Sequence, residues 1–146
     1  MLLSPQEAER FFRLHRTLMF FVNERLDIIA GVESPEAFAV LPAEERRKVR
    51  DALVERLDLI DAFVEANPTG FSDDELLIVR SWRNQLFGRF YIFRDLVKYT
   101  VFLRDKDGPV AFGVTALSQP FESLVGPYLP VMVETVLLPF QNKLVY

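Results

Sequence analysis

Apolar residues recur at helical spacing through the first part of the chain. After a start signal at Ser4 and Pro5, in which Glu7 can complete a capping box, the apolar stripe continues to Ile29, and Gly31 then stops the helix. The stripe consists of Phe11, Leu14, Leu18, Phe21 or Val22, Leu26 and Ile29. This pattern predicts a first long helix that buries one face.

Two further long helices are predicted by the same spacing. One begins at Pro42 and runs to Val64, after a short helical turn around Phe38. The other begins at a capping box that Ser72 opens, and Gly88 is placed to end it. The two stripes are Val49, Leu53, Leu57, Ile60 and Val64, and then Leu76, Val79, Trp82 or Arg83, and Leu86. Three main helices therefore precede residue 88.

The spacing of apolar residues changes at Gly88. Short segments rich in aromatic and β-branched residues follow, and turn-forming residues separate them. These strand candidates are 89–94, 98–103, 110–117, 131–138 and 143–146. Most are joined without a long crossover, so we expect mostly antiparallel pairing. Because both faces of the strands are apolar, the sheet should be covered on both sides or curled into a small barrel.

These patterns predict an α+β fold in a single domain over residues 1–146. Residues 1–87 form its helical part and residues 88–146 its β-rich part, with three main helices packed on a curved, mostly antiparallel sheet of about five strands. A chain of 146 residues is long enough to bury a core, and its fourteen phenylalanines are suited to fill one. We expect the two parts to pack as one unit.

Composition narrows the class of protein. Without cysteine, the chain has neither a disulfide framework nor a cysteine-based zinc site, and its acidic start does not read as a secretory signal, so we expect a cytoplasmic protein. The net charge of −4 argues against a dedicated nucleic-acid binder. Glu134, Pro130 and Pro139 interrupt the apolar closing segment, which argues against a membrane span.

Few residues carry recognisable chemistry. His15 is the sole histidine and lies beside the first apolar stripe, which favours a packing role over that of a general base. The acids Asp58, Asp61 and Glu65 share a helix face but have no histidine at metal-binding spacing. We therefore expect no catalytic residue, no metal site and no cofactor.

The strands supply the candidate residues for binding a ligand or a partner. Basic and aromatic side chains interleave after Gly88, and such a face can stack bases and pair with phosphates. Strict alternation places Arg94 on the opposite face from Tyr91, and Gly113 within a strand indicates a bulge or a close backbone approach. Glu134, alone in an apolar strand, either points outward or pairs with a cation, for which Arg83, Arg89 and Lys98 are the possible partners. The candidates are Arg89, Tyr91, Phe93, Lys98, Glu134 and Tyr146.

Three stretches resemble a family of uncharacterised bacterial proteins: GRFYIFRDLVKYTVFL, GPVAFGVTALSQPFE and LPVMVETVLLPFQNKLVY. Members of that family have helices first and then a β-rich segment, with an ending of the PVMVETVLLPF type followed by a glycine turn. The resemblance covers about residues 70–146, and it implies a cytoplasmic bacterial protein without implying an activity. Asn142 stands where the family has its turn glycine, and relatives continue past the position of Tyr146, which implies a shortened end here.

The leading hypothesis is a non-catalytic binding or interaction module of the bacterial cytosol. The apolar strand surface favours a protein partner or self-association, through a sheet edge that another chain could use. The alternatives are a nucleic-acid-binding or regulatory module that uses the aromatic and basic sheet face, and an enzyme of unknown type that uses scattered carboxylates. A small-molecule ligand stays undefined by the sequence.

Overall fold

The computed structural model describes residues 2–104 and 110–146, so the hairpin loop that the sequence predicts at 105–109 lies outside the described residues. The fold is α+β, with helices first and then a closed five-stranded barrel that contains one short helix. The helices are α1 (Pro5–Leu26), α2 (Pro35–Ala39), α3 (Ala43–Glu55), α4 (Asp58–Ala66), α5 (Asp73–Ser81), the 3₁₀ helix η1 (Trp82–Asn84) and α6 (Phe121–Val125). The strands are β1 (Leu86–Asp95), β2 (Thr100–Arg104), β3 (Val110–Thr115), β4 (Val131–Phe140) and β5 (Lys143–Val145).

The chain divides into two compact units. Arg10–Arg83 form a helical unit, and Asn84–Tyr146 form a barrel unit together with the chain up to Glu9. The predicted change of structure at residue 88 therefore lies close to the boundary after Arg83. No helix in the described ranges is long and apolar enough to cross a membrane.

Reciprocal side-chain bonds cap the first and the fifth helix. The Ser4 amide donates to Glu7 Oε2 at 2.9 Å, and the Glu7 amide donates to Ser4 Oγ at 3.2 Å. Ser72 and Glu75 form the same capping box at the start of α5. Both start signals in the sequence are confirmed, because each supplies partners for backbone N–H groups that a helix leaves unpaired.

Aromatic contacts hold the helical unit together. The Phe21 ring of α1 meets Phe63 of α4 edge-on, with ring centroids 5.3 Å apart. Nearer the start of α1, the Phe11 ring contacts Trp82, with ring centroids 5.4 Å apart. Arg13 of α1 pairs with Glu75 of α5, so a charged contact flanks the apolar one. The predicted stripe of α1 is thus the face that packs.

The predicted helix from Pro42 to Val64 is in fact two helices, α3 and α4, with a break at Arg56. On one straight helix with 3.6 residues per turn, Leu59 would point away from the Val49 stripe and Phe63 would lie at the edge of that stripe. The break lets α4 bury both of these large side chains. Their burial outweighs helix continuity, and no glycine or proline marks the break in the sequence.

The other two predicted helix ends lie earlier than expected. α1 ends at Leu26, where Asp27 takes a left-handed conformation with φ of 50°, rather than near Gly31. The last helical segment ends at Asn84, and β1 already begins at Leu86. Gly88 therefore lies within a strand, beside the Arg104 guanidinium, whose Nη2 donates to the Phe87 carbonyl at 2.9 Å.

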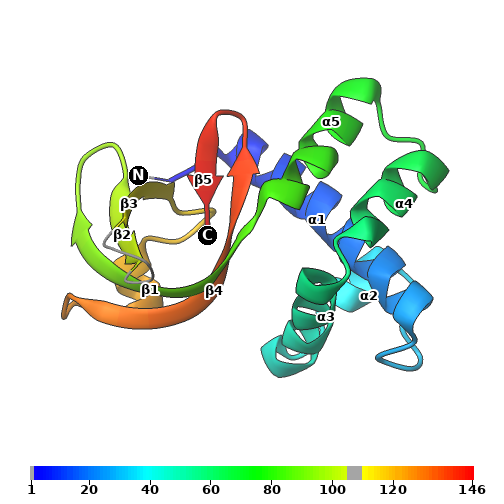
Figure 1. Ribbon diagram of the computed structural model, residues 1–146, viewed down its shortest axis with the longest axis horizontal. Helices are drawn as coiled ribbons and strands as arrows, with labels where there is room; N and C mark the ends of the chain where they lie inside the picture. The colour runs from blue at the N-terminus through cyan, green and yellow to red at the C-terminus, as the bar shows by residue number, and fades with distance from the viewer. Residues whose placement is uncertain (1, 105–109) are drawn as a thin grey trace. The chain divides into compact units, whose positions relative to one another are not determined.

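The barrel closes in the strand order β1-β2-β3-β5-β4 (Figure 1). Four neighbouring pairs besides β1–β4 complete the ring, and the β3–β5 pair alone among the described strands is parallel. The prediction of a mostly antiparallel sheet is confirmed, in its barrel form. β5 pairs with β3 on one side and with β4 on the other, so the closed barrel does not offer the sheet edge that the sequence analysis expected a partner chain to use.

The inward faces of the strands form the barrel core. Phe90, Ile92 and Phe102 are fully buried there, and the Tyr146 ring stacks on Phe121 of α6 with centroids 5.4 Å apart. These rings fill the barrel as side chains do in small barrels. The side chains that alternate with them along β1 and β4 are left on the outer face.

Candidate functional site

A row of side chains crosses the outer face of four barrel strands. The register places Met132 of β4 opposite Tyr91 of β1, Tyr91 opposite Leu103 of β2, and Leu103 opposite Ala111 of β3. Residues that are directly opposite share a face of the sheet, so the four side chains lie in one line. We call these four residues the outer row. Tyr91 and Met132 are 41% and 52% exposed.

A bulge in β1 widens this exposed surface. The pairing with β2 shifts between Ile92 and Arg94, so that Arg94 lies opposite Val101 instead of continuing the alternation. Val101 is on the outer face, since its neighbour Phe102 is in the core. The expectation that Arg94 faces away from Tyr91 is therefore wrong, because an extra residue re-aims the side chains that follow it. Phe93, the bulged residue, is 47% exposed.

Glu134 points outward beside the outer row. It lies opposite Arg89, and Arg89 Nε is 3.8 Å from Glu134 Oε2. The side chains are 74% and 52% exposed, so solvent screens their attraction and the pair contributes little to stability. Of the three cations named as possible partners, Arg89 is the one that pairs with Glu134, and the outward orientation of Glu134 is confirmed. The candidates Arg89, Tyr91, Phe93 and Glu134 thus lie together on one surface.

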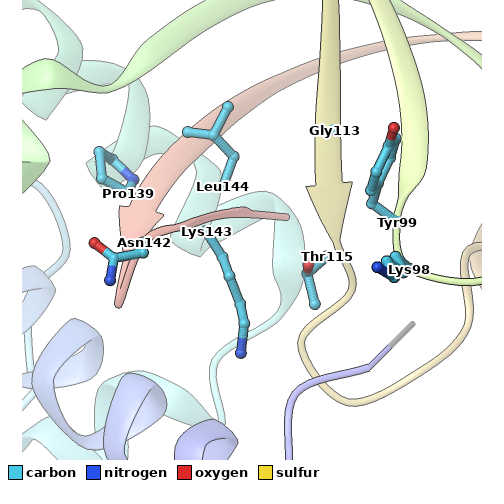
Figure 2. Close-up of a pocket in the computed structure, with 8 residues that line it drawn as sticks. All are labelled: Lys98, Tyr99, Gly113, Thr115, Pro139, Asn142, Lys143 and Leu144. Atoms are coloured by element: carbon cyan, nitrogen blue, oxygen red, sulfur yellow. The ribbon is translucent and has the colours of Figure 1, made fainter.

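A cavity of about 510 Å³ opens in another part of the barrel surface. Figure 2 shows Lys98 and Tyr99 on one side of it and Pro139 and Asn142 on the other. Thr115, Gly113, Lys143 and Leu144 complete the lining. Its walls therefore come from the β1–β2 connection, from β3, from the end of β4, and from β5 with the turn before it.

Local backbone structure fixes both walls of this cavity. In the β1–β2 connection, the Thr100 hydroxyl donates to Asp95, and the Leu96 amide donates to the Tyr99 carbonyl at 2.9 Å. On the other wall, Gln141 and Asn142 both take positive φ, at 47° and 64°, in a tight turn between β4 and β5. This confirms the turn that the sequence predicts there, since asparagine tolerates a left-handed conformation.

The Tyr99 ring lies against the backbone of Gly113. A Cβ atom on Gly113 would be 3.0 Å from Tyr99 Cδ2, closer than side chains normally approach. The expectation of a close approach at Gly113 is confirmed, whereas the register of β2 with β3 runs through Gly113 without a bulge. Tyr99 is 41% exposed, so the ring rests on the strand and presents its remaining surface to solvent.

Charges around the cavity are unevenly compensated. Lys143 Nζ lies 2.9 Å from Glu7 Oε1, and the Ser4 amide together with Lys143 holds the pKa of Glu7 below its ordinary value. Lys98, Thr115 and Asn142 make no side-chain hydrogen bond or ion pair with the described residues. One cation and two neutral polar groups are therefore left for solvent or a ligand.

Tyr146 lies away from the other candidates. Its ring packs on Phe121 and meets Phe102 edge-on at 5.8 Å, which places it against the barrel core. Lys98, by contrast, lines the cavity. The structure therefore divides the six candidates among the outer face, the cavity and the core.

His15 is half-buried and packs against aromatic rings in the helical unit. It stacks on Phe11 at 5.4 Å and meets Trp82 edge-on at 5.7 Å. Burial, with a smaller contribution from the positive charge of Arg46, lowers the pKa of His15 to about 4. The imidazole is thus neutral at physiological pH and packs against two aromatic rings, which agrees with a packing role.

The acids of the helical unit pair with arginines on its surface. Arg56 binds Asp58 through two hydrogen bonds of 3.0 and 3.1 Å, and Arg83 pairs with Asp61. Within residues 2–104 and 110–146, no three histidine or acidic side chains are grouped closely enough to hold a metal ion. These carboxylates therefore serve surface pairing in the described structure.

Sequence reasoning missed the contribution of Thr115, Asn142 and Lys143 to the cavity. They join Lys98 and Tyr99 because β5 pairs in parallel with β3, a contact between strands that are distant in the sequence. No local pattern encodes that pairing. The one signal in the sequence was Gly113, where a small residue inside a strand indicates that something lies close to the backbone.

Comparison with family models, with curated proteins and with solved structures returns no match for this chain. The resemblance of its closing segment to a bacterial family therefore stays an expectation, and function has to be inferred from the geometry of the barrel.

Proposed function

We propose that this chain is a non-catalytic interaction module, and that the outer row and its surroundings are the surface that binds another protein chain. The observation that carries the proposal is the line of Met132, Tyr91 and Leu103 across neighbouring strands, in which Met132 and Tyr91 are exposed and Leu103 is half-buried. Exposed apolar residues that adjoin each other mark interaction surfaces more often than single ones do.

The composition of this surface supports a protein ligand. Tyrosine, phenylalanine, methionine and arginine are enriched at protein–protein interfaces, and Tyr91, Phe93, Met132 and Arg89 bring all four types together. Tyrosine and arginine are also frequent among the residues that dominate binding energy. An apolar centre with charged residues beside it has the arrangement of an interface core and its rim.

A second copy of the chain is the ligand that this surface fits best. A twofold dimer uses the same patch on both subunits, so the patch must complement itself. Arg89 and Glu134 carry opposite charges next to the apolar row, and each could meet the other residue of a second copy. Because the barrel is closed, the contact would be made through the face of the sheet and not through an edge strand.

Sedimentation equilibrium at about 5 and about 500 µM, a range that brackets weak and transient dimers, tests this proposal. The expected result is an average mass that rises from the monomer toward the dimer with concentration. A mass that stays monomeric across the range would contradict self-association.

A second candidate function is binding of single-stranded nucleic acid, and the architecture of the barrel favours it. Five-stranded Greek-key barrels of the OB-fold type bind oligonucleotides and oligosaccharides, although a shared architecture does not establish a shared function. The basic residues Arg89, Arg94 and Lys98 are all exposed among aromatic ones. Filter binding of a labelled oligonucleotide at low and high salt decides this candidate, because absence of binding even at low salt would exclude it.

A further inference from the structure

We propose that the cavity between the β1–β2 connection and the β4–β5 turn binds a nucleotide unit, that is, a planar base joined to a phosphate group. The proposal concerns a different surface from the outer row and does not depend on self-association. It rests on four features of the cavity: an aromatic ring, an uncompensated cation, free polar groups and a suitable size.

The Tyr99 ring offers a stacking platform for the base. One side of the ring lies on the Gly113 backbone, which keeps it from collapsing into the barrel, and the ring is 41% exposed. A base that stacks on such a ring gains affinity with little dependence on its sequence. Because Gly113 has no side chain, the Tyr99 ring can approach this closely to the strand.

The Lys98 ammonium group supplies the charge for a phosphate. It belongs to the residue next to Tyr99 and has no acidic partner among the described residues. Lys143 lines the same cavity, but Glu7 compensates its charge at 2.9 Å. Lys98 is therefore the one cation among the described lining residues that is left to bind an anion. The negative charge of Glu7 would repel that anion and lower its affinity.

The neutral polar groups can recognise the edge of the base or the sugar. Thr115 is 4% exposed and makes no side-chain bond within the described chain, and Asn142 carries an amide with a free donor and a free acceptor. The cavity volume of about 510 Å³ is within the range of small-molecule sites. Figure 2 shows Thr115 between the two walls of the cavity and Asn142 on the wall opposite Lys98 and Tyr99.

Calorimetric titration of the whole chain at low salt with four probes tests the proposal. The probes are thymidine monophosphate, thymidine, inorganic phosphate and a six-nucleotide thymidine oligonucleotide. We expect the monophosphate to bind about tenfold more tightly than thymidine or phosphate alone, because stacking and charge act together. If the oligonucleotide binds more tightly still, the natural ligand is a strand; if it matches the monophosphate, the ligand is a free nucleotide.

Variants of the cavity separate its parts. Tyr99→Ala and Lys98→Ala should each weaken binding of the monophosphate by about tenfold, as loss of one stacking or charged contact does. Glu7→Gln should strengthen it, since the amide can still accept the Ser4 hydrogen bond while the opposing charge is gone. Arg80→Ala, which removes an exposed cation from the helical unit, is the matched control and should leave affinity unchanged, and Arg89→Ala tests whether the ligand lies on the outer face instead.

Three results would overturn the proposal. The first is no binding of the monophosphate at millimolar concentration, and the second is equal affinity in the wild type and in both the Tyr99 and the Lys98 variants. The third is an affinity loss in Arg89→Ala as large as that in Lys98→Ala, which would place the ligand on the outer face. Circular dichroism of each variant confirms that the barrel has folded before its affinity is compared.

Discussion

Tyr91 and Met132 lie directly opposite each other on β1 and β4, and both side chains are exposed although their strand neighbours Phe90 and Val133 pack in the barrel core. An apolar pair on the solvent side of a sheet contributes less to the fold than the buried pairs beneath it. If a second surface covers the pair, its apolar area is removed from water and contributes to the free energy of binding. This is the basis of the proposed interface.

The charged pair beside the outer row gives a prediction about the second copy. In a twofold dimer, Arg89→Glu alone or Glu134→Arg alone should weaken dimerisation by about tenfold, because like charges then meet across the interface. The double variant Arg89→Glu/Glu134→Arg should recover most of the affinity. Sedimentation of the three proteins checks this. If the two residues face solvent in the dimer, neither single variant should weaken dimerisation.

Stability below neutral pH should depend on His15. The pKa of His15 in the folded chain is about 4, below its ordinary value of 6.5. Between these two pH values the unfolded chain therefore binds a proton at His15 and the folded chain does not. The contribution of His15 is constant above pH 6.5 and becomes destabilising as the pH falls toward 4, by roughly 3 kcal/mol at most. Urea unfolding of wild type and His15→Phe between pH 7.5 and 4.5 measures it: the variant should lose less stability. Parallel curves for the two proteins would refute the buried imidazole.

Two tyrosines of the barrel unit should differ in their effect on stability. Tyr146→Ala removes a ring that stacks on Phe121 and touches Phe102, at a cost of about 2 kcal/mol. Tyr128→Ala is the control, because Tyr128 is 87% exposed and its truncation should cost less than about 0.5 kcal/mol. Thermal or urea unfolding compares the two. Equal losses would mean that Tyr146 does not anchor the chain end in the core.

Gly113 should matter for the cavity more than for the fold. In Gly113→Ala, the new Cβ would meet the Tyr99 ring at about 3.0 Å, and the exposed ring can move aside. We expect unfolding free energy to change by less than about 1 kcal/mol while the Tyr99 ring resonances shift in an NMR spectrum. If the resonances stay in place, the ring does not rest on Gly113 in solution.

Local patterns predicted those parts of the fold that local physics determines. The capping boxes at Ser4 and Ser72 and the turn at Asn142 each depend on a few neighbouring residues, and the structure confirms them. The break between α3 and α4 was missed because it depends on where Leu59 and Phe63 find a core, which no neighbouring residue reveals.

The candidate sites, too, were predicted from the sequence only where they depend on neighbouring residues. Exposure of Tyr91 and Phe93 followed from strand alternation, whereas the outward position of Arg94 depends on a bulge that no glycine or proline announces. The cavity needed the parallel pairing of β3 with β5, which brings Thr115 next to β5 from a distant part of the sequence. Such long-range pairings are decided by the whole barrel.

The measurement that tests the central claim most directly is sedimentation equilibrium of the wild type beside Tyr91→Ser/Met132→Ser. We expect the wild type to associate with rising concentration and the double variant to remain monomeric, with the same circular dichroism spectrum. The control is Val40→Ser/Leu77→Ser, which removes exposed apolar side chains from the helical unit, at 83% and 60% exposure, and should associate like the wild type. A wild type that stays monomeric, or a double variant that associates as the wild type does, would contradict the proposed interface.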